Sequence, residues 1–201
     1  MNDFKLNNHY KAIVMGGSAG SFQIIMKIIS SLPENFELPI ILCLHRLKHV
    51  RHGFVEALSS KSIKKVEEPS DKELIKAGKV YLAPANYHLS LELGLIFSLS
   101  TEEVVNNSRP SIDITMESAA NVYKNKLIGI LLSGANKDGA LGMKKIKDKG
   151  GLTIIQEPKE CVIDIMPTAA LQVTTIDHTL YSDKIIKLLL DLHKKIKNSS
   201  T

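Results

Sequence analysis

The sequence has 201 residues, with 44% hydrophobic and 23% charged side chains and a formal net charge of +5 at pH 7. This is the length of one ordinary domain, and the composition is that of a globular protein. No apolar run approaches the ~20 residues that a membrane span requires, and the modest positive charge lacks the dense basic and aromatic surface of nucleic-acid binding. We therefore expect one cytoplasmic domain over residues 1–201, with neither nucleic acid nor membrane insertion.

The first half of the chain predicts alternating strands and helices. Short apolar runs without polar alternation are typical of parallel strands buried on both faces, and recurring apolar positions at helical spacing separate them. The first predicted helix ends before Pro33, which cannot continue it. In chain order we expect strand 12–15, helix 22–31, strand 39–44, helix 53–60, and strands 62–66 and 79–83.

The second half begins with a different pattern. Residues 87–99 alternate between polar and apolar side chains around Gly94, which predicts a β-hairpin, and the polar stretch 100–110 predicts a loop. We then expect helix 112–124, strand 127–132, helix 139–149, strand 152–156, helix 166–173, a strand near Thr175 that ends before His178, and helix 183–197. The fold class is thus α/β: a three-layer α/β/α, doubly wound, mainly parallel sheet with a protruding β-hairpin.

Three of the predicted strands end at reactive side chains. Ser18 follows the first strand, His45 ends the second, and Asp138 follows the strand at 127–132. Parallel strands share one carboxyl edge, where open α/β folds place their sites. A nucleophile, a base and an orienting carboxylate would converge there, as hydrolysis of an ester or amide needs.

Ser18 lies in Gly16-Gly17-Ser18-Ala19-Gly20, which fits the G-x-S-x-G pattern of a nucleophile elbow. Small neighbours allow the sharp turn that lifts the hydroxyl from the sheet edge. The turn would also leave the backbone N–H of Ala19 near a helix N-terminus, where it can stabilise an oxyanion. The alternative is an anion cradle, because phosphate-binding loops also connect a strand to a helix.

The two partners of Ser18 have structural alternatives. His45 could be an ordinary strand-end histidine, and Asp138 could be a plain helix cap. An α/β-hydrolase would instead order its triad Ser, Asp, His and recruit His178, although that fold places several strands before the elbow. We expect Gly17, Gly134 and Ala135 to form the pocket wall. Cys43 and Cys161 show no disulfide framework or metal-ligand spacing, so no metal and no cofactor are expected.

Several blocks in order resemble the catalytic domain of the chemotaxis protein-glutamate methylesterases, the CheB family. They are Gly16–Gly20, Leu44-His45-Arg46, Val80–Pro84 with His88-Leu89, Arg109–Asp113, Leu132–Gly134 with Asp138–Ala140, Gly150-Gly151 and Met166-Pro167. The resemblance implies a Ser18, His45 and Asp138 triad, the same residues that strand-end chemistry selects. It also implies demethylation of receptor glutamate methyl esters and deamidation of receptor glutamines.

This chain departs from the family pattern at a few positions. Ala19 and Ser21 stand where the family usually has threonine and glycine, and Ala135-Asn136 stands in place of Met-Gly. Family members commonly carry an N-terminal receiver domain, which we expect to be absent here. Methylated chemoreceptor cytoplasmic domains are the expected partners. Either the enzyme works without control by a receiver domain, or a separate receiver or kinase protein controls its activity.

Overall fold

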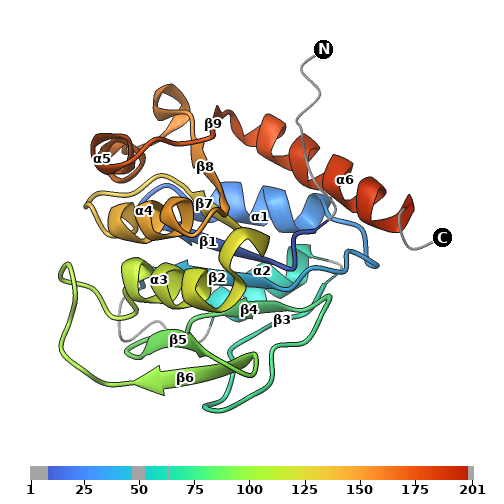
Figure 1. Ribbon diagram of the computed structural model, residues 1–201, viewed down its shortest axis with the longest axis horizontal. Helices are drawn as coiled ribbons and strands as arrows, with labels where there is room; N and C mark the ends of the chain where they lie inside the picture. The colour runs from blue at the N-terminus through green and yellow to red at the C-terminus, as the bar shows by residue number, and fades with distance from the viewer. Residues whose placement is uncertain (1–8, 47–52, 63, 199–201) are drawn as a thin grey trace.

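A seven-stranded parallel sheet forms the centre of the protein. The computed structural model describes residues 9–46, 53–62 and 64–198 (Figure 1). The sheet strands are β1 (Ala12–Gly17), β2 (Ile40–Leu44), β3 (Val66–Glu67), β4 (Val80–Leu82), β7 (Leu127–Leu131), β8 (Leu152–Gln156) and β9 (His178–Leu180). The helices are α1 (Phe22–Ser31), α2 (Phe54–Lys61), α3 (Ile112–Tyr123), α4 (Ala140–Asp148), α5 (Ile165–Val173) and α6 (Ser182–Asn198), with short 3₁₀ turns at Lys124–Lys126 and Pro158–Glu160.

The order of the strands reverses in the middle of the sheet. It reads β3-β4-β2-β1-β7-β8-β9, and every neighbouring pair is parallel. The chain therefore places β2, β3 and β4 on one side of β1 and, after the hairpin and α3, β7, β8 and β9 on the other. The crevice at such a switch point is where open α/β sheets bind their ligands. Ser18 follows β1 and the loop to Asp138 follows β7, so both flank this crevice.

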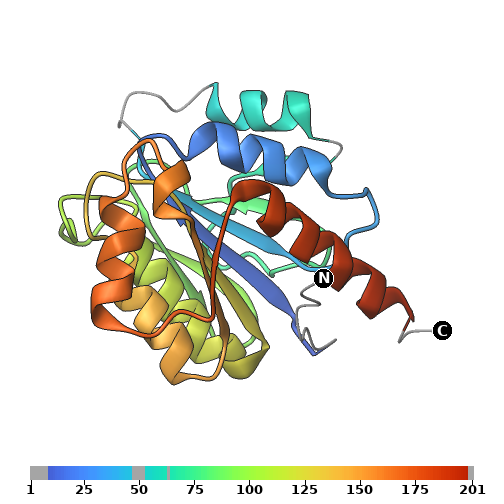
Figure 2. The same ribbon diagram turned by 90° about the horizontal axis from the view of Figure 1, so that it is seen from above.

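Helices cover both faces of the sheet, as Figure 2 shows from above. Along β1, Ile13 and Met15 pack with α1 and α6, whereas Ala12 and Val14 pack with α3 and α4 on the opposite face. Both sets are fully buried, which explains the uninterrupted apolar sequence of the strand. The predicted three-layer, doubly wound architecture is confirmed.

The predicted β-hairpin forms a separate two-stranded antiparallel sheet of β5 (His88–Glu92) and β6 (Ile96–Ser100). It lies beside α3, below the main sheet in Figure 1. Leu89, Leu91 and Phe97 project into the core on the α3 side of the sheet, while Leu93 at the tip is exposed. The hairpin and α3 together place the loop at 101–111 beside the carboxyl edge of the sheet.

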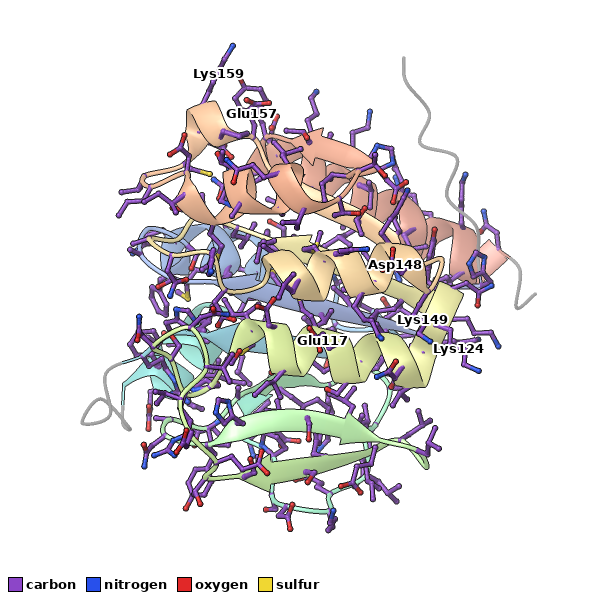
Figure 3. All side chains as sticks on the ribbon, turned by 60° about the vertical axis from the view of Figure 1, so that its left-hand side comes forward. Glu117, Lys124, Asp148, Lys149, Glu157 and Lys159 are labelled. Carbon is purple, nitrogen blue, oxygen red and sulfur yellow. The ribbon has the colours of Figure 1, made fainter. Side chains whose placement is uncertain are left out.

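Outward-facing side chains of α3 and α4 are mostly polar, although Leu141 of α4 is also exposed, in contrast to the apolar faces that the helices turn to the sheet. Figure 3 labels Glu117 on α3 and Asp148 and Lys149 at the end of α4 on this outer surface. Within the described residues, no helix combines the length and the apolarity that crossing a lipid bilayer would demand.

Two local predictions were wrong. Strand 62–66 shrinks to Val66–Glu67, with Ile63 outside the described residues. Here Lys64 is buried, and its ammonium donates to the carbonyls of Glu34, Phe36 and Gly78 at 2.7–2.9 Å, which ties three loops together. The other concerns residues 178–180: the sequence placed a strand before His178, but this residue begins β9 itself.

Candidate active site

Ser18 is held firmly by its backbone at the end of β1. Its N–H donates to the carbonyl of Ser133 at 2.9 Å, across the switch point. Its carbonyl accepts from both the N–H and the hydroxyl of Ser21, at 3.0 and 2.7 Å. The side chain is half-buried, and its hydroxyl makes no hydrogen bond within the described ranges. The fold thus fixes the Ser18 backbone and leaves its oxygen available for reaction.

The backbone beyond Ser18 offers unused donors. Ala19 and Gly20 are exposed, and neither N–H donates to an acceptor in the described part of the chain. The carbonyl of Ala19 is fixed by the Ser133 hydroxyl at 2.7 Å, and α1 begins three residues later. Free N–H groups just before a helix present partial positive charge to a developing oxyanion.

His45 lies on the strand next to Ser18. Leu44 pairs with Gly17 in the β2–β1 register, and the N–H of His45 donates to the carbonyl of Gly17 at 3.3 Å. Its ring Nε2 is 2.8 Å from Oδ2 of Asp138, a residue that comes from the loop after β7. The structure therefore brings all three predicted residues to one crevice, with a direct hydrogen bond between the imidazole and the carboxylate.

Asp138 is completely buried, and five donors of the described residues surround its carboxylate. Besides His45, these are the amide of Asn106 (3.0 Å), the hydroxyl of Ser111 (2.9 Å), and the backbone N–H groups of Ile112 (2.7 Å) and Asp113 (3.1 Å). Ser111, Ile112 and Asp113 form the N-terminus of α3. Asp138 caps a helix, but it caps α3 rather than α4, the helix that its own loop opens.

These donors decide the charge of Asp138. Burial alone would raise its pKa, but the hydrogen bonds from His45, Ile112, Asn106 and Asp113 outweigh this effect and hold the pKa below its ordinary value. The carboxylate is therefore ionised at neutral pH. As an acceptor it fixes the proton of His45 on Nε2, so the lone pair of the neutral ring lies on Nδ1.

Asp113 makes the reciprocal contact. It lies in the first turn of α3, yet its Oδ1 accepts from the N–H groups of Gly139 and Gly142, at 2.9 and 2.7 Å, at the start of α4. Each helix is thus capped by a carboxylate from the other segment. The amide nitrogen of Asn106 bridges the two carboxylates, 2.9 Å from Asp113 and 3.0 Å from Asp138.

Burial, together with the neighbouring charge of Asp138, raises the pKa of Asp113 to about 6. An unfolded aspartate titrates near ~3.9, so between these values the folded state binds more protons than the unfolded state. By linkage, the contribution of Asp113 to stability is complete below the unfolded value and is lost as pH rises through about 6.

We expect Asp113→Asn to remove this pH dependence. The free energy of unfolding of the wild type, relative to the variant, should fall by about 2 kcal/mol from pH 4 to pH 7. Denaturant titrations at several pH values measure it, with Asp183→Asn in the exposed first turn of α6 as the matched control. If the free energy of unfolding changed with pH in the same way in the wild type and in Asp113→Asn, Asp113 would not titrate in this range.

Sequence reasoning missed the turn at residues 105–108. Val105 and Ser108 exchange backbone hydrogen bonds, and Asn106 and Asn107 between them have φ of 51° and 60°. The turn places Asn106 on both carboxylates and the hydroxyl of Ser108 3.3 Å from Nδ1 of His45. The Asn-Asn pair was the available signal, because asparagine tolerates the left-handed region that such turns need.

The three predicted wall residues differ in their surroundings. Gly17 and Gly134 are buried, and a Cβ at either would lie within 2.5 Å of Ser21 or Met166. Their absent side chains allow close packing, so neither presents an open wall. Ala135 is exposed at the same edge of the sheet and remains the predicted wall residue.

His178 lies away from this crevice. It begins β9, the edge strand, and β7 and β8 separate β9 from β1. Three strand spacings correspond to roughly 14 Å. Across the described residues, no three His, Cys, Asp or Glu side chains gather as metal ligands, and Cys43 and Cys161 are free thiols.

Comparison with known proteins agrees with this geometry. The CheB methylesterase family model matches residues 13–189. A Leptospira interrogans protein named "putative protein-glutamate methylesterase/protein-glutamine glutaminase" is 44% identical over 92% of this chain and 95% of its own length. The protein-glutamate methylesterase/protein-glutamine glutaminase of Thermotoga maritima is 35% identical over 90% of this chain and 54% of its own length.

The fold comparison gives the same result. The crystal structure of the Thermotoga maritima CheB methylesterase catalytic domain superposes with a TM-score of 0.87 at 35% sequence identity. The match covers 91% of this chain and 98% of that domain. The seven-stranded sheet and its flanking helices are thus shared over almost the whole of both chains.

Proposed function

This chain belongs to the CheB methylesterase family and is a protein-glutamate methylesterase and protein-glutamine glutaminase, and we propose that Ser18, His45 and Asp138 form its catalytic triad. The observation that carries the proposal is the 2.8 Å hydrogen bond between His45 and the buried Asp138, beside Ser18 at the switch point of the sheet. Asp138 orients the ring and stabilises its protonated form, while Nδ1 serves as the base.

The reaction is acyl transfer in two steps. Ser18 Oγ attacks the carbonyl carbon of a glutamyl methyl ester, and Nδ1 of His45 takes the hydroxyl proton. The tetrahedral intermediate collapses, the bond to the methoxy group breaks, and Nδ1 returns the proton as methanol leaves. Water then attacks the acyl-enzyme with the same proton transfers and frees the glutamate. A glutamine side chain follows the same route with ammonia as the leaving group.

The negative oxygen of each tetrahedral intermediate needs donors that are already in place. The exposed N–H of Ala19 has no acceptor within the described residues and stands before the N-terminus of α1. We assign it to the oxyanion hole. A backbone donor of this kind typically contributes about 10²–10³-fold to the rate.

The substrates are chemoreceptor glutamates, as the family implies, and we propose that methylated cytoplasmic domains of chemoreceptors are the direct partners. An enzyme acting on them works in the cytoplasm. The exposed Ala135, together with the turn at residues 105–108, lies at the edge where such a segment would reach Ser18.

Methanol release tests this function directly. The full chain is incubated with methylated receptor cytoplasmic fragments, and we expect methanol from methylated fragments but none from unmethylated ones. A fluorophosphonate probe should label Ser18 in parallel, because only an activated serine reacts. Labelling without methanol release would indicate an esterase for other substrates. Failure of both reactions would favour the non-catalytic, Rossmann-like anion-binding module, with Ser18 in an anion cradle.

A further inference from the structure

The hydroxyl of Ser108 faces the nitrogen of His45 that acts as the base. Its Oγ lies 3.3 Å from Nδ1, whereas Nε2 on the other side of the ring is bound to Asp138. Since Asp138 holds the ring proton on Nε2, Nδ1 carries the lone pair and Ser108 donates to it. Within the described residues, the imidazole is thus held at both nitrogens by side chains from two separate loops.

Ser108 also has a second acceptor within reach. The carbonyl oxygen of Asn106 lies 3.4 Å from the same hydroxyl. When Ser18 turns toward Nδ1, the Ser108 hydrogen can rotate to this carbonyl. The Ser108 oxygen then faces Nδ1 with a free lone pair and can accept from Nδ1–H after the ring is protonated. One hydroxyl therefore suits both states of the base without moving a heavy atom.

The turn carrying Ser108 is anchored from several sides. Its backbone bonds to Val105 at 2.9 and 3.2 Å, and Asn106 is held by Asp113 and Asp138. The next residue, Arg109, donates to the carbonyls of Thr101 and Glu102 and to the side chain of Asn86. The hydroxyl is consequently placed by the same network that holds the triad carboxylate.

We propose that Ser108 is a positioning residue for His45, whose hydroxyl keeps Nδ1 aligned between Ser18 and the leaving group. This inference rests on the proposed function. During attack, the O–H bond of Ser18 breaks and the N–H bond forms at Nδ1, and the leaving group later takes that proton. The hydrogen of Ser108 is not transferred. It only changes acceptor, from Nδ1 to the carbonyl of Asn106.

The test compares Ser108→Ala and Ser108→Thr with the wild type, in the full chain, using a small chromogenic acetate ester and a fluorophosphonate probe. We expect Ser108→Ala to lower kcat by about 10- to 150-fold with KM nearly unchanged, as loss of one hydrogen bond to a charged group predicts. Ser108→Thr retains the hydroxyl and should restore most of kcat. Peptide mapping should find the probe on Ser18 in all three proteins.

Ser90→Ala is the matched control, because this half-buried serine of the hairpin donates only to a neighbouring carbonyl and should leave kcat unchanged. An unchanged kcat in Ser108→Ala would overturn the positioning role, and so would equal losses in the Ala and Thr variants. A probe attached to Ser108 would make it the nucleophile and overturn the inference as well. An unlabelled wild type would instead overturn the proposed function and this inference with it.

Discussion

Ser18→Ala is expected to abolish methanol release from methylated receptor fragments while leaving the fold intact. Without the hydroxyl no acyl-enzyme can form, and loss of a triad nucleophile typically costs ~10⁶-fold in kcat. The Ser18 backbone hydrogen bonds to Ser133 and Ser21 do not involve its side chain, so the substitution removes no hydrogen bond of the described structure. Activity and melting temperature, measured on the same preparation, give the comparison.

The matched control is Ser21→Ala, three residues away on the same turn. Ser21 donates its hydroxyl to the carbonyl of Ser18, so its loss should loosen the turn and reduce the rate only partly. If Ser18→Ala kept more than ~1% of the wild-type rate, the nucleophile assignment would be wrong, since triad loss costs far more than this.

His45→Gln should reduce the rate of ester hydrolysis by several orders of magnitude, because glutamine cannot take the proton of Ser18. The variant also removes the donor that faces Asp138, which leaves one of its five observed hydrogen bonds unmade. We expect a loss of at least ~10⁴-fold in kcat, as for other triad members. Fluorophosphonate labelling of Ser18 should fall in parallel, which links the loss to activation of the nucleophile.

His178→Gln provides the contrast on the edge strand β9. Its separation from β1 by two intervening strands predicts a small effect on kcat. If His178→Gln abolished activity and His45→Gln had little effect, the α/β-hydrolase triad, in the chain order Ser, Asp, His, would explain the data better than Ser18, His45 and Asp138.

Residues at the strand ends could be predicted because their surroundings are simple. Ser18 and His45 follow uninterrupted apolar runs, and parallel strands must bring those ends to one edge. The hairpin could be predicted from the alternation of polar and apolar residues on either side of Gly94. In each case a short stretch of sequence carries the whole signal, and no distant contact is needed to interpret it.

The contacts of the site that escaped prediction all depend on tertiary packing. Asp138 looks like the cap of its own helix, and only the close approach of α3 and α4 turns it toward Ile112 instead. The pairing of Ser108 with His45 spans 63 positions in the chain. The burial of Lys64 against three carbonyls likewise has no local sequence signal, because lysine side chains are usually exposed to solvent.

The exchange of carboxylates between α3 and α4 makes the proposed triad part of a cooperative folding unit. Asp138 cannot swing out without uncapping α3, and α4 loses Asp113 if α3 undocks. Local opening at this edge of the sheet therefore carries the free energy of separating two packed helices, well above that of an ordinary loop fluctuation. The amide protons of Ile112 and Gly142 should exchange with solvent through the same opening event. We therefore expect the enzyme to be active only while α3 and α4 are packed together, and to lose activity when they separate.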